Sequence, residues 1–370
     1  MKSSRHELRM GAMVELTSST LLWVVVVAAV LLPLITVVIW SRSAPGRSTA
    51  SALGLAASRL LLVVVSQLVA VVALFLWVNN QYGFYNTWAD LLGQEASRPE
   101  PVATTGLSAG KGTLERLVIH GQAAGVTGQA LVWLPPQYQD PRYAGMKFPV
   151  LMFLPGQPSS PQHVYGEYNL GAVATEEIAA GKIKPFVAVF PPIMINPPRD
   201  TECTDVAGGP PAEKWLVDDV TRAMTSQYRV EPPGKKWSVA GWSTGALCAA
   251  KLVLRHPQQF AASVSFGGMY QAYLDNTTGD LFGGDKQLQN ENSPLWLYQN
   301  RGGTQGTKLL LIAGKADTES WPTTSQMVTV AKGDPNVTLL TFPLGGHNYR
   351  NYVSQLPAAL VWLQGTGAFG

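Results

Sequence analysis

Two stretches without a charged residue constrain this chain more than any other feature of its sequence. They run from Thr20 to Trp40 and from Leu60 to Gln81. Each holds about 20 residues, and at about 1.5 Å per residue this length of helix crosses the hydrocarbon core of a bilayer. A cleaved signal peptide is an alternative for the first stretch but leaves the second unexplained. The sequence therefore predicts a membrane anchor over residues 1–93, with transmembrane helices at about 20–40 and 60–80.

Basic residues around these stretches indicate how the anchor is oriented. The connecting loop carries three of them and no acidic residue: Arg42, Arg47 and Arg59. Because basic loops stay on the cytoplasmic side, both ends of the chain are predicted to lie on the extracellular side of the cell membrane. Lys2, Arg5 and Arg9 favour the opposite orientation. We expect translation to start at Met13, which removes those three charges, and a start at Met1 is the alternative.

A change in composition separates the anchor from the rest of the chain. Residues 94–112 are rich in Pro, Gly, Ser and Thr, which predicts a linker. Over residues 113–370, short apolar runs alternate with helical patterns, which is typical of an α/β fold with a mostly parallel central sheet and helices on both faces. The expected strands are Leu114–His120, Gln129–Leu134, Pro149–Leu154, Phe186–Phe190, Trp237–Ala240, Ala262–Phe266, Lys308–Ile312 and Val337–Phe342.

One expected helix, Glu213–Tyr228, shows a clear division of faces. Leu216 and Val220 fall on a stripe that would pack on the sheet. Asp218 and Asp219 fall on another stripe and are expected in water.

Gly241-Trp242-Ser243-Thr244-Gly245 lies between an expected strand and a helical run, Ala246–Arg255. Gly-x-Ser-x-Gly allows the sharp strand-to-helix turn that exposes a serine oxygen. A serine hydroxyl becomes nucleophilic when a base takes its proton. The pattern predicts a serine hydrolase with Ser243 as nucleophile.

Elimination selects the base. The chain has five histidines: His6, His120, His163, His256 and His347. In the order typical of this turn the base follows the serine. His256 lies at the far end of the helix, roughly 18–20 Å away, so His347 is predicted to be the base.

The acid should follow a strand that lies between Ser243 and His347. Asp317 comes just past the apolar run Leu309–Ile312 and is preferred, and Glu319 is the alternative.

Backbone amides are expected to bind the oxyanion that forms during acyl transfer. One is the N–H of Thr244, directly after the nucleophile. The other should come from the turn after the third strand, Leu154-Pro155-Gly156-Gln157. Proline has no N–H, so Gly156 or Gln157 must supply it, and we prefer Gln157.

Cys203 and Cys248 are the only cysteines. In an exported domain they would form a disulfide that ties a polar loop to the helix after Ser243, and two unrelated thiols are the alternative. No ligand spacing for a metal appears, and no cofactor is predicted. A net charge of +3 is too small to suggest nucleic acid as a partner. The oligomeric state is left open.

The ordered motifs resemble the putative-esterase family of α/β-hydrolases, which includes esterase D-like enzymes and antigen 85 mycolyltransferases. The matching segments span roughly residues 113–366 and are Leu134–Tyr138, Leu154–Gln157, Gly241–Gly245, Arg255–Pro257 with Phe260, and Gly345–Tyr349. The resemblance implies an α/β-hydrolase fold and ester hydrolysis or acyl transfer through Ser243, Asp317 and His347. Antigen 85 proteins carry paired aspartates after the oxyanion loop to bind trehalose, where this chain has Pro158–His163, so the resemblance does not extend to that acceptor.

The favoured hypothesis is a membrane-anchored serine esterase that faces outward and acts on a lipid or cell-envelope ester. One alternative is an acyltransferase that uses a sugar or lipid alcohol. Another is a catalytically inactive hydrolase-fold binding protein. Tyr349, Tyr352 and Trp362 are interpreted as core residues rather than an acyl pocket.

Overall fold

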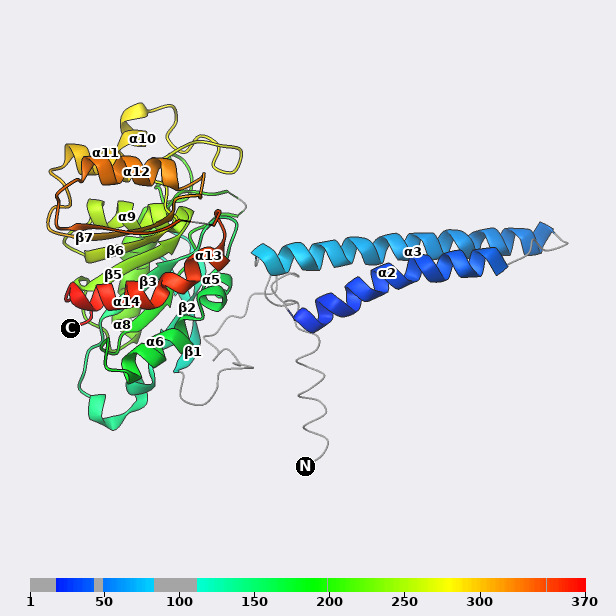
Figure 1. Ribbon diagram of the computed structural model, residues 1–370, viewed down its shortest axis with the longest axis horizontal. Helices are drawn as coiled ribbons and strands as arrows, with labels where there is room; N and C mark the ends of the chain where they lie inside the picture. The colour runs from blue at the N-terminus through cyan, green and yellow to red at the C-terminus, as the bar shows by residue number, and fades with distance from the viewer. Residues whose placement is uncertain (1–17, 43–48, 83–111, 198, 344) are drawn as a thin grey trace. The chain divides into compact units, whose positions relative to one another are not determined.

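The structure is a computed structural model that describes residues 18–42, 49–82, 112–197, 199–343 and 345–370. Residue contacts divide the chain into two units, residues 1–96 and 97–370, which Figure 1 shows as a pair of helices and an α/β part. Several predictions fall outside the described residues. These are the charges of Lys2, Arg5, Arg9 and Arg47, the start at Met13, and the linker except Gly112.

Helices α2 (Ser19–Arg42) and α3 (Thr49–Tyr82) form the described part of the first unit and pack against each other. Within them, Thr20–Ser41 and Gly54–Asn80 are long and apolar enough to cross a membrane. Most of their large apolar side chains are exposed. Length, composition and exposure are compatible with the predicted anchor, because lipid would cover such surfaces.

An eight-stranded sheet forms the centre of the second unit, in the order β1-β2-β4-β3-β5-β6-β7-β8. β2 pairs antiparallel with both β1 and β4, and the other neighbouring pairs are parallel. The strands are β1 (Thr113–His120), β2 (Thr127–Leu134), β3 (Val150–Leu154), β4 (Val187–Phe190), β5 (Gly234–Trp242), β6 (Phe260–Phe266), β7 (Lys308–Gly314) and β8 (Val337–Phe342). Each overlaps a predicted strand, which confirms the mostly parallel sheet.

Helices cover both faces of the sheet (Figure 1). Successive side chains of a strand point to opposite faces. In β3, Val150 and Met152 therefore join one apolar cluster with α8 and α9, and Leu151 and Phe153 join another with α5, α6 and α14. The helices are α5 (Pro161–Tyr168), α6 (Leu170–Ala179), α7 (Ala212–Lys214), α8 (Thr221–Gln227), α9 (Thr244–Arg255), α10 (Lys286–Glu291), α11 (Pro294–Asn300), α12 (Trp321–Val330), α13 (Tyr349–Tyr352) and α14 (Leu356–Gly365). Short 3-10 turns span Pro136–Gln139, Pro141–Tyr143 and Val353–Gln355.

The helix predicted over Glu213–Tyr228 differs from the expectation in two ways. Its middle, Trp215–Val220, is a π-helical segment between α7 and α8. The prediction that Asp219 lies in water was wrong, because it is only 2% exposed. Its carboxylate accepts the backbone N–H groups of Ala123 and Ala124 and pairs with Arg222, so a loop distant in sequence buries this acid, while Asp218 is exposed as expected.

Replacing Asp219 with alanine removes the acceptor of two backbone N–H groups. We expect Asp219→Ala to lower the free energy of unfolding by about 2–3 kcal/mol, the cost of leaving buried donors unpaired. Urea titration of the detergent-solubilised full chain, followed by tryptophan fluorescence, measures this. Asp218→Ala is the matched control and should change stability by less than about 0.5 kcal/mol. Equal effects of the two substitutions would contradict the structural role of Asp219.

Candidate active site

Ser243 occupies the turn between β5 and α9 in a strained conformation, with φ 54° and ψ −118°. Non-glycine residues adopt such angles at a cost of about 1–3 kcal/mol, and only where the surroundings hold them. Here the Ser243 N–H donates to the Phe266 carbonyl at 3.0 Å. A Cβ on Gly245 would lie 2.3 Å from the Pro155 carbonyl oxygen, so the close packing of α9 on the end of β3 requires glycine at this position.

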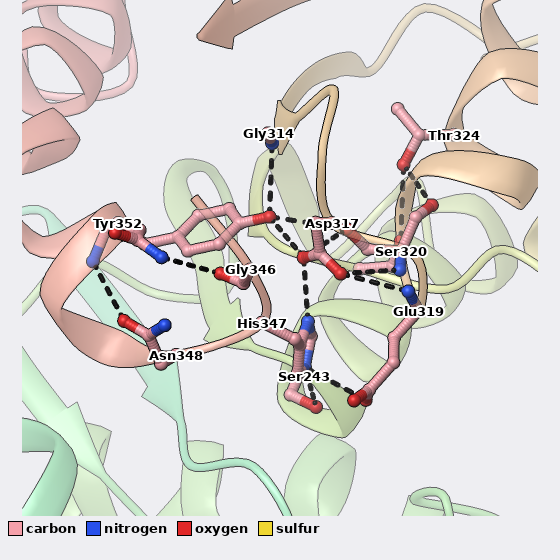
Figure 2. Close-up of polar contacts among 12 residues, drawn as sticks. Ser243, Gly314, Asp317, Glu319, Ser320, Thr324, Gly346, His347, Asn348 and Tyr352 are labelled. Carbon is pink, nitrogen blue, oxygen red and sulfur yellow. Dashed lines mark hydrogen bonds and ion pairs between the residues drawn. The ribbon is translucent and has the colours of Figure 1, made fainter. Parts of the chain in front are cut away.

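A chain of two hydrogen bonds links three side chains that the sequence analysis singled out. His347 Nε2 lies 2.8 Å from Ser243 Oγ, and His347 Nδ1 lies 2.8 Å from Asp317 Oδ2 (Figure 2). Asp317 has no proton to give when ionised, so Nδ1 donates to it and Nε2 is left to accept from the serine hydroxyl. The loops after β7 and β8 bring these groups to Ser243.

Four further donors hold the buried carboxylate of Asp317. The backbone N–H groups of Glu319 and Ser320 donate to Oδ1 at 3.0 and 3.1 Å. Oδ2 accepts from Ser320 Oγ at 2.7 Å and from Tyr352 Oη at 2.5 Å. Burial alone would raise the pKa of Asp317, but the bonds from His347, Tyr352 and Ser320 outweigh it and leave the pKa below its usual value. The acid therefore stays ionised beside the imidazole.

Sequence reasoning missed Ser320 and Tyr352 as ligands of this carboxylate. Tyr352 is buried, as the core interpretation predicted, but its hydroxyl also accepts the N–H of Gly314 at 3.1 Å, which orients it toward Asp317. The only sequence signal for Ser320 is its spacing, three residues after an aspartate, at which a side chain and a backbone N–H can both turn back onto a carboxylate.

An aromatic cluster fixes the orientation of the imidazole. The Trp242 ring stacks on His347 with centroids 4.6 Å apart and planes 24° apart. Tyr349 and Tyr352 each pack against Trp242 at 4.8 Å. Aromatic contacts of this kind contribute about 0.5–1.5 kcal/mol each beyond the area they bury.

Glu319, the alternative acid, lies on the other side of the imidazole. Its Oε2 is 3.8 Å from His347 Nε2, and its side chain is 66% exposed. Asp317 rather than Glu319 therefore bonds Nδ1, and the two acids face opposite nitrogens of one ring.

The turn after β3 lies against Ser243. A Cβ on Gly156 would be 3.1 Å from Ser243 Cβ and 2.8 Å from Trp242 Cδ1, so glycine is needed for this approach. The N–H of Gly156 is directed to the hydroxyl of Tyr349. The N–H groups of Thr244 and Gln157 have no acceptor among the described residues, which leaves both free to bind an oxyanion.

A disulfide and a buried lysine connect a loop to the middle of α9. Cys203 and Cys248 form a disulfide with an S–S distance of 2.07 Å. Lys251 Nζ donates to the carbonyls of Glu202 and Cys203 at 2.6 and 2.9 Å, and burial lowers the pKa of Lys251 to about 8. These contacts fasten the loop around Cys203 to α9.

No group of three or more His, Cys, Asp or Glu side chains among the described residues is arranged to hold a metal ion.

Comparison with known proteins identifies the family. Residues 123–363 match the family described as Putative esterase. The chain belongs to this family. It is also similar to an uncharacterized protein of Corynebacterium glutamicum, with 23% identity over 255 residues, or 64% of this chain. The chain spans 57% of the length of that relative.

Solved structures of esterases share the fold of the second unit. A ferulic acid esterase superposes with a TM-score of 0.59 at 17% identity, over 69% of this chain and 98% of that one. An S-formylglutathione hydrolase from Agrobacterium tumefaciens gives 0.59 at 15% identity, over 74% and 99%. A fluorophosphonate-binding serine hydrolase of Staphylococcus aureus gives 0.57 at 18%, over 68% and 98%. The predicted α/β-hydrolase fold is confirmed.

Acid unfolding tests the contact between Tyr352 and Asp317. Because the folded pKa of Asp317 lies below the unfolded value of about 3.9, this group stabilises the fold above that pH and the contribution is lost as pH falls. Tyr352→Phe removes a donor and raises the folded pKa, so acid unfolding, followed by near-UV circular dichroism, should begin roughly 0.3–0.5 pH unit higher. Tyr165→Phe is the control and should leave the onset of acid unfolding unchanged, because the Tyr165 hydroxyl has no hydrogen-bond partner among the described residues. A Tyr352→Phe curve that coincides with the wild type would count against this contact.

Proposed function

We propose that the protein is a membrane-anchored serine esterase that hydrolyses carboxylic esters through an acyl-enzyme on Ser243. The observation that carries the proposal is the continuous chain of bonds from Asp317 through His347 to Ser243, with both distances at 2.8 Å. Family membership supports it, and so does the order of Ser243, Asp317 and His347 along the chain, which is typical of α/β-hydrolases.

In the first step, Ser243 Oγ attacks the ester carbonyl while His347 Nε2 takes the hydroxyl proton. The carbonyl oxygen becomes an oxyanion, and we assign the N–H groups of Thr244 and Gln157 to bind it. Asp317 holds the imidazole through Nδ1 and stabilises the positive charge that develops there. The tetrahedral intermediate then collapses, the bond to the leaving alcohol breaks, and Nε2 returns its proton to that alcohol.

In the second step, water attacks the acyl-enzyme and gives its proton to His347 Nε2. Collapse of the new intermediate releases the carboxylic acid and returns the proton to Ser243 Oγ. Acyl transfer would use the same intermediate with an alcohol in place of water. We propose hydrolysis, since the similar structures named above are an esterase and two hydrolases.

Two apolar helices support a location at the cell membrane, with the catalytic domain outside and a substrate of lipid or cell-envelope type. Thr20–Ser41 and Gly54–Asn80 can each span a bilayer, and the basic loop between them favours a cytoplasmic position. A disulfide between Cys203 and Cys248 fits an oxidising compartment. A tethered enzyme of this kind meets esters at the bilayer surface.

Removing the nucleophile tests the reaction. Ser243→Ala should lower kcat for p-nitrophenyl butyrate by at least about 10⁴-fold, because nucleophile, base and acid act as a unit. Release of p-nitrophenol by the detergent-solubilised full chain measures this. Ser226→Ala, an exposed serine on α8, is the matched control and should keep full activity. A Ser243→Ala variant that still turns over the ester at more than a tenth of the wild-type rate would refute the proposal.

Topology is tested in intact cells with a membrane-impermeant fluorophosphonate probe. The predicted outward orientation exposes Ser243 to the probe, so intact cells and lysed cells should label to a similar extent. Cells that express Ser243→Ala should show no band at the size of the protein. Labelling that appears only after lysis would overturn the orientation.

A further inference from the structure

The N–H group of Thr244, which we assign to the oxyanion, has no acceptor among the described residues. A donor that has to stay free for substrate cannot be held in place by its own hydrogen bond. The backbone bonds of this turn attach to Ser243, whose carbonyl accepts the N–H groups of Ala246 and Leu247 at 2.9 and 3.1 Å. The side chain of Thr244 is therefore the part of the residue that can anchor it further.

A buried carboxyl group provides that anchor. Thr244 Oγ1 donates to Asp200 Oδ2 at 3.2 Å, and the two residues are only 6% and 4% exposed. Threonine is branched at Cβ and has few side-chain rotamers, so a hydroxyl that is held at one point also restrains the main chain to which it is attached. The bond to Asp200 therefore restrains the backbone of Thr244, with its free N–H.

Asp200 is itself fixed by bonds to two other segments. Its Oδ1 accepts the N–H of Glu202 at 2.9 Å, and its own N–H donates to the carbonyl of Thr277 at 3.1 Å. Burial raises the pKa of Asp200, but in either protonation state its oxygens can bond the Thr244 hydroxyl. The anchor of Thr244 is therefore a rigid one.

The loop that carries Asp200 is fastened to one face of α9 at three successive points. Asp200 bonds Thr244 in the first turn, Cys203 forms the disulfide with Cys248, and Lys251 Nζ donates to the Cys203 carbonyl at 2.9 Å. Positions 244, 248 and 251 have the spacing of a single helical stripe. The bond between Asp200 and Thr244 is the end of this row that lies next to the active site.

We propose that Asp200 is a positioning residue for the oxyanion: its bond to the Thr244 hydroxyl holds the Thr244 N–H in the direction that binds the developing negative charge. This rests on the proposed esterase function and adds a residue outside the chain of bonds from Asp317 to Ser243. The oxyanion forms only after the substrate has bound, so loss of the contact should lower kcat and leave KM nearly unchanged.

Removing either end of the bond tests the proposal. Thr244→Val removes the hydroxyl and keeps the shape of the side chain. It should lower kcat for p-nitrophenyl butyrate about tenfold, less than the roughly 10²–10³-fold loss when a whole oxyanion donor is removed. Asp200→Ala should lower kcat by the same factor. Rates are measured on the detergent-solubilised full chain and counted per site titrated with a fluorophosphonate, so that unfolded protein does not lower them.

The double variant Asp200→Ala/Thr244→Val separates positioning from a general structural role. If Asp200 acts through the Thr244 hydroxyl, the second substitution adds nothing to the first, and the double variant has the kcat of either single variant. Thr244→Ser and Asp200→Asn should restore the wild-type kcat, because serine keeps the hydroxyl and an amide can still bond it. Thr244→Val carries the test by itself if Asp200→Ala does not fold.

A trifluoromethyl ketone reports on the oxyanion directly. Its carbonyl carbon bonds Ser243 Oγ, the serine proton moves to His347 Nε2, and the carbonyl oxygen becomes an oxyanion. The inhibition constant should rise about tenfold in Thr244→Val, in step with the fall in kcat/KM. Thr307→Val is the matched control, since it removes another buried threonine hydroxyl, one that donates to the Thr304 carbonyl at 2.7 Å just before β7. It should leave both quantities at their wild-type values.

The outcomes keep the two proposals apart. A Thr244→Val variant with the wild-type kcat and inhibition constant would overturn the positioning role and leave the esterase function standing. So would single-variant effects that multiply in the double variant. Failure of the wild type to hydrolyse p-nitrophenyl butyrate would overturn the esterase function, and the positioning role with it.

Discussion

The bond between Asp317 and His347 is the interaction on which the rest of the site depends. A buried carboxylate is costly unless hydrogen bonds satisfy it, and Asp317 accepts five, from the imidazole, two hydroxyls and two backbone N–H groups. Hydrogen bonds to an ionised acceptor are stronger than those between neutral groups, so they hold the Asp317 carboxylate in one orientation. An imidazole held at Nδ1 by that carboxylate has its other nitrogen at Ser243.

The sheet supplies the geometry for this bond. β5, β7 and β8 run parallel, so the segments after their carboxyl ends lie along one edge, where open α/β sheets keep their sites. Ser243, Asp317 and His347 each follow one of these strands. The strain at Ser243 is maintained by close packing, because Gly245 lets α9 sit on the end of β3. The arrangement of these three side chains is therefore a consequence of how tightly the sheet and α9 pack.

Local patterns sufficed to predict much of this arrangement. Apolar runs predicted the strands, and the sequence analysis named Ser243, His347 and Asp317, the three side chains that the structure links by hydrogen bonds. Contacts between segments that are distant in the sequence could not be predicted from it. Tyr352 reaches Asp317 from the segment after β8, 35 residues away, and Asp219 is buried by a loop nearly 100 residues earlier. The position of Glu319 depends on the turn that Asp317 itself makes, which spacing alone does not reveal.

The most direct test of the account has two parts. Peptide mass spectrometry maps the residue that a fluorophosphonate modifies, and the rate of adduct formation is compared between the wild type and His347→Gln. The central claim is that Asp317 and His347 activate the hydroxyl of Ser243. It predicts a single adduct on the peptide that contains Ser243, and a rate at least about 10³-fold lower without the base. An adduct on any other residue, or an equal rate in His347→Gln, would contradict it.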